Sequence, residues 1–224
     1  MIARFLRKYP LLIASLLLLG FNTALIAMRI AYSHRLYYVF LMWNLFLAVI
    51  PFLFMELGRL LYNRKKILWA SWSLFFLSLL FLPNSPYIIT DLFHLKPRHS
   101  VPFWYDTLMI FSFATTGVVF FFATLKSMYR FLKHFSQPLV AQLSISLIIY
   151  LCAFGVYLGR YLRFNSWDIL THPGYLFSQI FERIVFPLDH PKTWAMTLVY
   201  GTLLCLGWML MNLLGDNQET RALR

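Results

Sequence analysis

The chain has 224 residues, of which 60% are hydrophobic and only 12% are charged, and its mean hydropathy is +0.67. This composition excludes an ordinary soluble domain and indicates that the bilayer is the solvent of the folded chain. The formal net charge of +12 does not indicate a nucleic-acid-binding protein, because the 20 Lys and Arg are scattered in short clusters between apolar runs. We therefore expect the lipid bilayer, and no nucleic acid, as a partner.

Six apolar runs approach the roughly 20 residues with which a helix crosses a hydrocarbon core of about 30 Å. Because only helices satisfy their own backbone polar groups in lipid, the runs predict an all-α fold, a single integral membrane bundle of about six transmembrane helices. A basic N-terminus before the first run resembles a signal peptide, but the run is too long for one and is predicted to be an uncleaved span. The predicted spans are residues 11–28, 36–55, 67–82, 107–125, 139–158 and 194–214.

The distribution of Lys and Arg between spans predicts the orientation of the chain in the membrane. Twelve of these 20 residues fall on the side of the two termini and eight on the other side, so both termini are predicted to be cytoplasmic. The long connections 83–106 and 159–193 then lie outside, and they hold five of the eight acidic residues. Connections of this length are usually functional or contain helices of their own, and we expect both, with short amphipathic helices in the two outer loops.

Polar side chains within the spans are few. Asn44 lies about 12 Å below the outer end of the second span, where it could form the floor of an outer-facing site. The more ordinary interpretation is a hydrogen bond to a neighbouring helix, which contributes about 1 kcal/mol. Pro51 is expected to kink the same span, and Glu56 is expected to pair with Arg59 one turn further on.

The third span is predicted to stop at the motif Leu-Pro-Asn-Ser-Pro of residues 82–86. Ser85 followed by Pro86 is typical of an N-cap and first helical residue, so a short helix to Leu95 is predicted. One face of this helix is polar, and the opposite face is apolar. The polar face consists of Tyr87, Thr90, Asp91 and His94.

Two interpretations of this short helix remain open. It could lie flat in the membrane interface, with its polar face in water. Alternatively the polar face looks into the bundle, where Asp91 and His94, three residues apart, could share a proton or bind one metal ion. The Trp-Tyr-Asp segment that ends at Asp106 could then supply a third ligand, although aromatic residues at a span entrance are common in any membrane protein.

The second outer segment begins with Arg160 and Arg163, one helical turn apart. They could present two guanidinium groups to a phosphate or carboxylate, or simply extend to the lipid headgroups. Asn165 and Asp168 have the spacing of a capping box, and Asp168 could instead pair with either arginine. Residues 175–186 then predict an amphipathic helix in the interface.

Several of these segments together resemble the bacterial multi-pass membrane family catalogued as domain of unknown function 1361. The segment Pro-Asn-x-Pro-Tyr-x-x-Thr-Asp-Leu is unlikely to arise by chance, and the resemblance extends over nearly the whole chain. It implies a bacterial cytoplasmic membrane and brings no established reaction, cofactor or catalytic residue. The segments are residues 43–48 with Pro51, 82–92 with His94, 104–106, and 159–168.

The sequence leaves the function open between three classes. The first is an outer-face site that binds or modifies a lipid headgroup or cell-envelope molecule, and the second is a sensing or assembly protein without chemistry. A small transporter is the least supported, because only one acid lies deep in a span and no repeat is evident. The sequence leaves open whether a cofactor or a metal ion binds. The candidate catalytic residues are Asp91, His94 and Asp106, and the candidate binding residues are Asn44, Asn84, Tyr87, Arg160, Arg163, Asn165 and Asp168.

Overall fold

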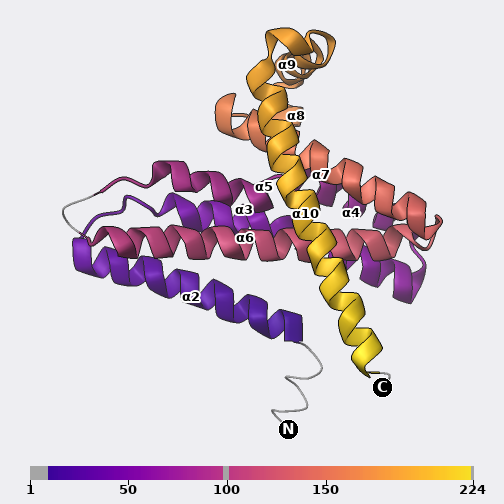
Figure 1. The fold of residues 1–224 in the computed structure, drawn as a ribbon, viewed down its shortest axis with the longest axis horizontal. Helices are drawn as coiled ribbons and strands as arrows, with labels where there is room; N and C mark the ends of the chain where they lie inside the picture. The colour runs from indigo at the N-terminus through magenta and orange to yellow at the C-terminus, as the bar shows by residue number, and fades with distance from the viewer. Residues whose placement is uncertain (1–9, 98–100, 223–224) are drawn as a thin grey trace.

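A computed structural model describes residues 10–97 and 101–222, and all the elements within these ranges are helices (Figure 1). Six helices are long and apolar enough to cross a membrane, which confirms the predicted all-α membrane bundle. Five of them are the single helices α2 (Pro10–Ser33), α3 (Phe40–Lys65), α6 (Phe103–Leu132), α7 (Pro138–Tyr161) and α10 (Pro191–Ala222). The remaining span runs from Leu68 to His94, where α4 (Leu68–Phe81) is followed by two short helical elements. The short ones are α5 (Asn84–Tyr87), η1 (Ile88–His94), α8 (Asp168–Thr171), α9 (Pro173–Val185) and η2 (Pro187–Asp189).

The chain is therefore a multi-pass membrane protein, and its helices extend beyond most of the predicted spans. The third span, predicted over residues 67–82, starts one residue later at Leu68, and α4 ends at Phe81 before the break. The second span was expected to start at Leu36 but starts at Phe40. A turn precedes the helix there, in which the backbone N–H of Val39 donates to the carbonyl of Leu36 at 3.2 Å. Apolar residues at 36–39 thus belong to a connection, which hydropathy alone does not distinguish from a span.

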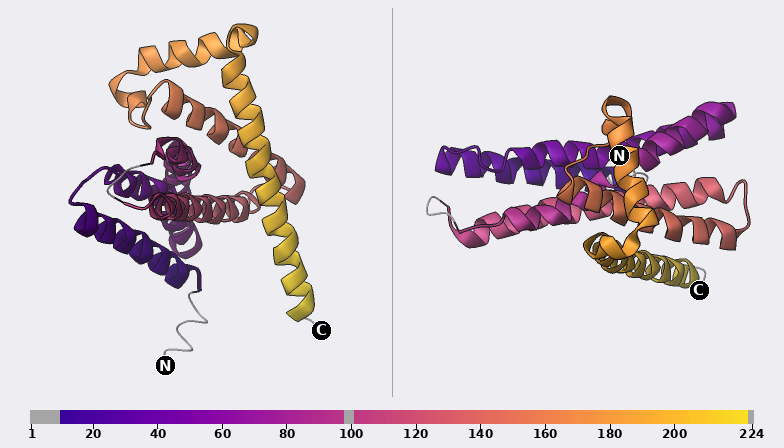
Figure 2. Two further views of the ribbon diagram at one scale, coloured as in Figure 1. Left: turned by 60° about the vertical axis from the view of Figure 1, so that its left-hand side comes forward. Right: turned by 90° about the horizontal axis from the view of Figure 1, so that it is seen from above.

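Helix α6 is the central element of the bundle. It contacts α2, α3, α5, η1 and α7. Among the residues that it contributes to the core, Phe113, Phe121 and Leu125 are fully buried. Helix α2 packs mainly on α6, while α10 packs on α7 and crosses the direction of α6 steeply (Figures 1 and 2). Large apolar side chains cover the outside of the spans. This is expected for helices whose outer surface contacts lipid tails.

The break in the third span is packed directly against α3 and α6. The hydroxyl of Ser85 donates to the carbonyl of Ala48 at 2.7 Å, and Ser78 donates to the carbonyl of Pro51 at 2.7 Å. Pro51 interrupts the hydrogen-bond ladder of α3, because it has no backbone N–H. The two serine hydroxyls therefore bond to carbonyls of α3 close to this interruption. A Cβ on Gly117 of α6 would overlap the carbonyl oxygen of Ser85, so only glycine permits this close approach.

The predicted role of Ser85 as an N-cap is therefore wrong. Helix α5 begins at Asn84, two residues before the predicted start at Pro86, and its N-cap position is Pro83. The hydroxyl of Ser85 serves the neighbouring helix α3 instead of its own helix. Pattern rules for caps assume a free hydroxyl, and here a carbonyl of the neighbouring helix α3 accepts it instead.

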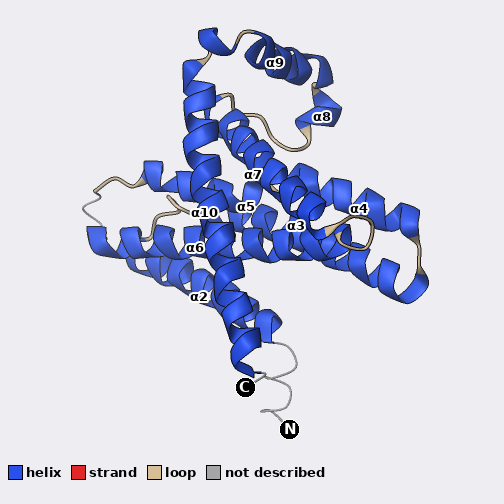
Figure 3. Cartoon of the chain, turned by 45° about the vertical axis from the view of Figure 1, so that its right-hand side comes forward, coloured by secondary structure: helices blue, strands red, loops and turns tan. Residues whose placement is uncertain are grey.

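The connection 159–193 holds α8, α9 and η2, which confirms that this loop contains helices. Helix α9 joins α8 to the start of α10 at one end of the molecule (Figures 2 and 3). Its apolar side chains Phe177, Phe181 and Ile184 are exposed, while Arg183 is buried and bonds to Gln179 of the same helix. This arrangement is typical of a helix in the membrane interface, and that placement stays a prediction.

Candidate functional site

The carboxylate of Asp91 is the centre of a polar cluster formed by three elements. Asp91 lies on η1 and only 1% of it is exposed. The amide nitrogen of Asn44, on α3, donates to its Oδ2 at 2.8 Å. Nη1 of Arg160, near the end of α7, lies 3.8 Å from its Oδ1 as an ion pair. Thr90 and Asp91 of the polar face are thus buried in the bundle, whereas His94 is exposed. The alternative of a helix lying flat with that face in water is wrong for Asp91.

Arg160 also contacts His94, so the guanidinium connects two of the three candidate catalytic residues, Asp91 and His94. Its Nη1 lies 2.9 Å from Nε2 of His94, and its Cζ lies 5.1 Å from the centre of the Phe93 ring. Since a guanidinium only donates, Nε2 accepts and the imidazole is neutral with its proton on Nδ1. The positive group between Asp91 and His94 disfavours a divalent metal there. Within residues 10–97 and 101–222 no three His, Cys, Asp or Glu side chains gather in a metal-binding group.

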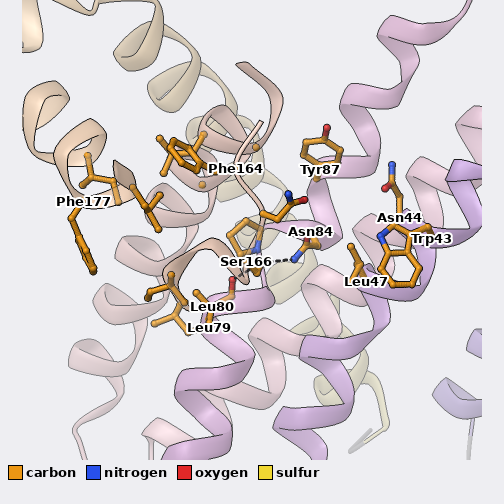
Figure 4. Close-up of a pocket in the computed structure, with 18 residues that line it drawn as sticks. Trp43, Asn44, Leu47, Leu79, Leu80, Asn84, Tyr87, Phe164, Ser166 and Phe177 are labelled. Atoms are coloured by element: carbon orange, nitrogen blue, oxygen red, sulfur yellow. Dashed lines mark hydrogen bonds between the residues drawn. The ribbon is translucent and has the colours of Figure 1, made fainter. Parts of the chain in front are cut away.

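A cavity of about 310 Å³ lies beside this cluster, and Asn44 belongs to both (Figure 4). One wall comes from α3 and the break in the third span, and the opposite wall from the end of α7 and the connection that follows it. In Figure 4, Asn44, Asn84 and Tyr87 lie across the cavity from Phe164 and Phe177. The polar lining residues are Trp43, Asn44, Asn84, Tyr87, Asn165 and Ser166, and the apolar ones are Leu47, Leu79, Leu80, Pro83, Leu158, Phe164, Ile169, Leu176, Phe177 and Ile180, with Gly155 and Gly159 between them.

Asn84 and Ser166 join the two walls of the cavity. The amide nitrogen of Asn84 donates to the hydroxyl of Ser166 at 2.9 Å and to the carbonyl of Phe81 at 2.8 Å. The hydroxyl of Ser166 donates in turn to the carbonyl of Leu80 at 3.2 Å. A Cβ on Gly159 would lie 3.3 Å from the Tyr87 ring, so a small residue at the end of α7 lets this ring lie against it. The cavity therefore has walls whose positions are fixed by hydrogen bonds and packing.

Asp168 stabilises the loop that carries Asn165 and Ser166. Its Oδ2 accepts the backbone N–H of Asn165 at 2.7 Å, and its Oδ1 accepts the hydroxyl of Thr171 at 3.0 Å. The backbone bond from Asn165, more than any other interaction, holds the pKa of Asp168 below its ordinary value. The predicted role of Asn165 as N-cap is wrong, because α8 begins at Asp168 and its N-cap is Trp167. The bond from the backbone N–H of Asn165 to Asp168 that a capping box would contain is nevertheless present. The alternative in which Asp168 pairs with Arg160 or Arg163 is not what the structure has.

Two candidates lie outside this cluster. Arg163 follows the end of α7, is exposed and has a left-handed backbone with φ of 62°, so it does not act with Arg160 as a clamp on one group. Asp106 forms a bidentate pair with Arg29 of α2, from Nε to Oδ1 at 2.7 Å and from Nη2 to Oδ2 at 3.1 Å. Both residues of this pair are 1% exposed. Asp106 is thus engaged with Arg29 and not with Asp91 or His94.

Sequence reasoning did not single out Arg29, Phe93 or Ser166. Arg29 was counted only as a charge near the outer end of the first span, although it interrupts an apolar run that continues to Tyr32. A lone arginine in such a run is a signal for a buried partner. Phe93 lies on the apolar face of the predicted helix. No sequence pattern predicts that Arg160 stacks on its ring.

Comparison with known proteins places most of the chain in one family. Residues 43–206 match the family model described as "Protein of unknown function (DUF1361)". This range includes all ten candidate residues named above, but it does not include Arg29. No curated protein and no solved structure matches the chain.

Proposed function

The chain belongs to this family of proteins of unknown function, so its role has to be argued from its own residues, and we propose that it binds an amphipathic, lipid-like molecule in the cavity beside Asn44. One observation carries the proposal. The cavity combines amide and hydroxyl groups with long apolar walls and, among its lining residues, contains no charged side chain. Binding sites of this kind surround the apolar part of a ligand and orient it with a few polar groups.

The polar end of the cavity favours an uncharged headgroup. Asn44, Asn84 and Asn165 present amide groups, which bind hydroxyls and amides equally well as donors and acceptors. The nearest cation, Arg160, is engaged with Asp91 and His94, so it positions the carboxylate that holds Asn44. A sugar or peptide headgroup of a cell-envelope molecule has the required chemistry.

The apolar end of the cavity favours a hydrocarbon tail. Leu79 and Leu80 form one side, and Phe177 and Ile180 of α9 form the other. The exposed apolar residues of α9 continue this surface toward lipid. A lipid could therefore enter from the bilayer without its tail crossing water, and transfer of apolar surface between two apolar environments requires little free energy.

A second candidate function is chemistry on the bound headgroup. The observation that favours it is the buried carboxylate of Asp91 with His94 one turn away, because such pairs serve as general acids and bases. Replacing Asp91 by Asn keeps the shape and the possibility of a bond to Asn44. If the protein only binds, Asp91→Asn retains the unmodified ligand at or near the wild-type level. If it catalyses, this variant accumulates a substrate that the wild type converts.

The binding proposal is tested by identifying what the purified protein retains. We expect mass spectrometry of the chain extracted from its native membrane to detect a defined lipid-like molecule in near-stoichiometric amount. Ile180→Trp, which fills the cavity, should remove it, while Ile184→Trp on the exposed side of α9 should not. Equal retention by both variants, or a random sample of bulk lipids in all of them, contradicts the proposal.

The proposal also includes the location of the cavity on the outer face of a bacterial cytoplasmic membrane. The excess of Lys and Arg on the side of the termini and the resemblance to a bacterial family support it. A cysteine in place of Ser178 should react with a membrane-impermeant maleimide in intact cells, and one in place of Asn63 should not. Both positions are exposed, so they form a matched pair. The reverse labelling pattern places the cavity on the cytoplasmic side.

A further inference from the structure

Arg29 retains a hydrogen-bond donor that its partners leave unused. Asp106 engages Nε and Nη2, and the guanidinium lies 4.6 Å from the centre of the Tyr38 ring. Nη1 is buried and has no hydrogen-bond acceptor among the residues that the structure describes. A buried charged donor without an acceptor is unfavourable, which indicates that something else occupies this position in the membrane.

Arg29 lines a second cavity, separate from the one beside Asn44. This cavity has a volume of about 250 Å³ and lies between the end of α2 and the start of α6. Except for Arg29 itself, the lining side chains are apolar or aromatic, and the aromatic ones are Tyr32 and Tyr105. The hydroxyl of Tyr105 donates to the carbonyl of Leu25, so its hydrogen is not available to a ligand.

The charge of the site determines the kind of acceptor that fits it. Arg29 and Asp106 together are neutral, and a phosphate placed against Nη1 would bring a second negative charge close to the buried carboxylate of Asp106. A neutral carbonyl oxygen satisfies the donor without this repulsion. The required ligand is therefore a carbonyl group attached to hydrocarbon.

The depth of Arg29 agrees with one source of such carbonyls. The first span ends at Ser33, so Arg29 lies about 6 Å inside its end at the rise of an α-helix. The headgroup regions add roughly 5–8 Å to each side of the hydrocarbon core. Arg29 thus lies near the boundary of the hydrocarbon, where the ester groups of acyl lipids are found.

We propose that the cavity at Arg29 is a binding site for one acyl lipid, in which Nη1 donates to an ester carbonyl and the acyl chain contacts Met28 and Tyr32. This site does not depend on the function proposed for the cavity beside Asn44. A lipid bound there would lie between the end of α2 and the start of α6. These two helices contact each other along few residues, so the lipid would add contacts between them.

The ester group is tested with two lipids that have the same headgroup. The chain is reconstituted in nanodiscs of dioleoyl phosphatidylcholine or of the corresponding diether lipid, transferred to detergent, and the retained lipids are counted by native mass spectrometry. We expect the wild type to retain one ester lipid more than ether lipid. Equal retention of the two lipids shows that the headgroup or the chains make the contact, and overturns the proposal.

Two variants test the position of the lipid. Met28→Trp fills the cavity and leaves the Arg29–Asp106 pair in place, so it should lose the additional ester lipid, while Leu17→Trp on the exposed surface of α2 should keep it. The double variant Arg29→Met with Asp106→Leu removes the donor without leaving an unpaired charge, and it should lose the same lipid. Retention of the additional lipid in either Met28→Trp or the double variant overturns the proposal.

Discussion

The amide nitrogen of Asn44 lies 2.8 Å from Oδ2 of Asp91, so a side chain within helix α3 determines the position of a carboxylate on η1, 47 residues further along the chain. The same side chain lines the cavity. A change at Asn44 therefore affects the polar cluster and the cavity together, and its consequences can be measured separately as stability and as ligand retention.

Replacing Asn44 by Leu should lower the free energy of unfolding by about 1–3 kcal/mol, because the buried carboxylate of Asp91 loses a donor. The bound molecule should be lost as well. Unfolding in mixed micelles titrated with SDS measures the first effect, and mass spectrometry of the purified chain measures the second. Ser144→Leu, at a partly exposed position of α7 where the hydroxyl bonds only to the carbonyl of Val140 in its own helix, is the control. Unchanged stability and ligand retention in Asn44→Leu would show that the bond to Asp91 has neither role.

Removing only one member of the pair between Arg29 and Asp106 should be severely destabilising. Arg29→Met leaves the carboxylate buried and unpaired, for which we expect a loss of about 3–5 kcal/mol. The double variant with Asp106→Leu should recover most of this loss, since no uncompensated charge remains. A double-mutant cycle from the four free energies of unfolding gives the coupling. Simple additivity of the two single changes is incompatible with the pairing described above.

Gly117→Ala tests the contact between α6 and the break in the third span. The added methyl group would overlap the carbonyl oxygen of Ser85, and we expect a loss of about 1–3 kcal/mol in the free energy of unfolding. Gly20→Ala on α2 is the matched control, because no atom lies within 4 Å of the added group. Helix propensity alone should leave that control unchanged or up to about 1 kcal/mol more stable. Equal changes in the free energy of unfolding for Gly117→Ala and Gly20→Ala would contradict a close contact between Gly117 and Ser85.

The loop around Asp168 should lose order in acid. The bond from the Asn165 N–H lowers the pKa of Asp168 below its ordinary value of 3.8, so the folded loop binds the proton more weakly than the unfolded chain does. The stabilisation is therefore present above pH 3.8 and is lost as the pH falls through the lowered pKa. The amide proton resonance of Asn165 should move with a midpoint below 3.8, and Asp168→Asn should abolish this movement. A midpoint above 3.8 contradicts the assigned bond.

The membrane spans could be predicted because hydrocarbon thickness and backbone hydrogen bonding leave few alternatives for runs of this length. The ion pair of Glu56 with Arg59 was predictable for a similar reason, since both partners lie on one helix turn, and the contact at 3.2 Å confirms it. The bond of Asn44 to a neighbouring helix was predicted without its partner. Which of several polar residues lies opposite Asn44 depends on the relative depth of two helices, and hydropathy does not fix that depth.

The partner of Asp106 could not be predicted from the sequence. Its acidic character and its position beside Trp104 and Tyr105 fit an outer-facing site, whereas the structure pairs it with Arg29. An arginine near the end of a span usually extends to the headgroups, so its inward direction follows only from the packing of α2 on α6. The amphipathic pattern of η1 had the same ambiguity, because a polar face suits water and the interior of a polar bundle equally well.

The hydroxyl of Tyr200 on the last span donates to the carbonyl of Pro86 at 2.7 Å. During synthesis the residues of the break leave the ribosome more than a hundred residues before this tyrosine does. The segment that holds Asn84, Tyr87 and Asp91 therefore reaches its final hydrogen-bonded state only after α10 has entered the membrane. A chain that ends before Pro191 is expected to insert five spans and to be a target of membrane quality control, because its central break still lacks the hydroxyl of Tyr200.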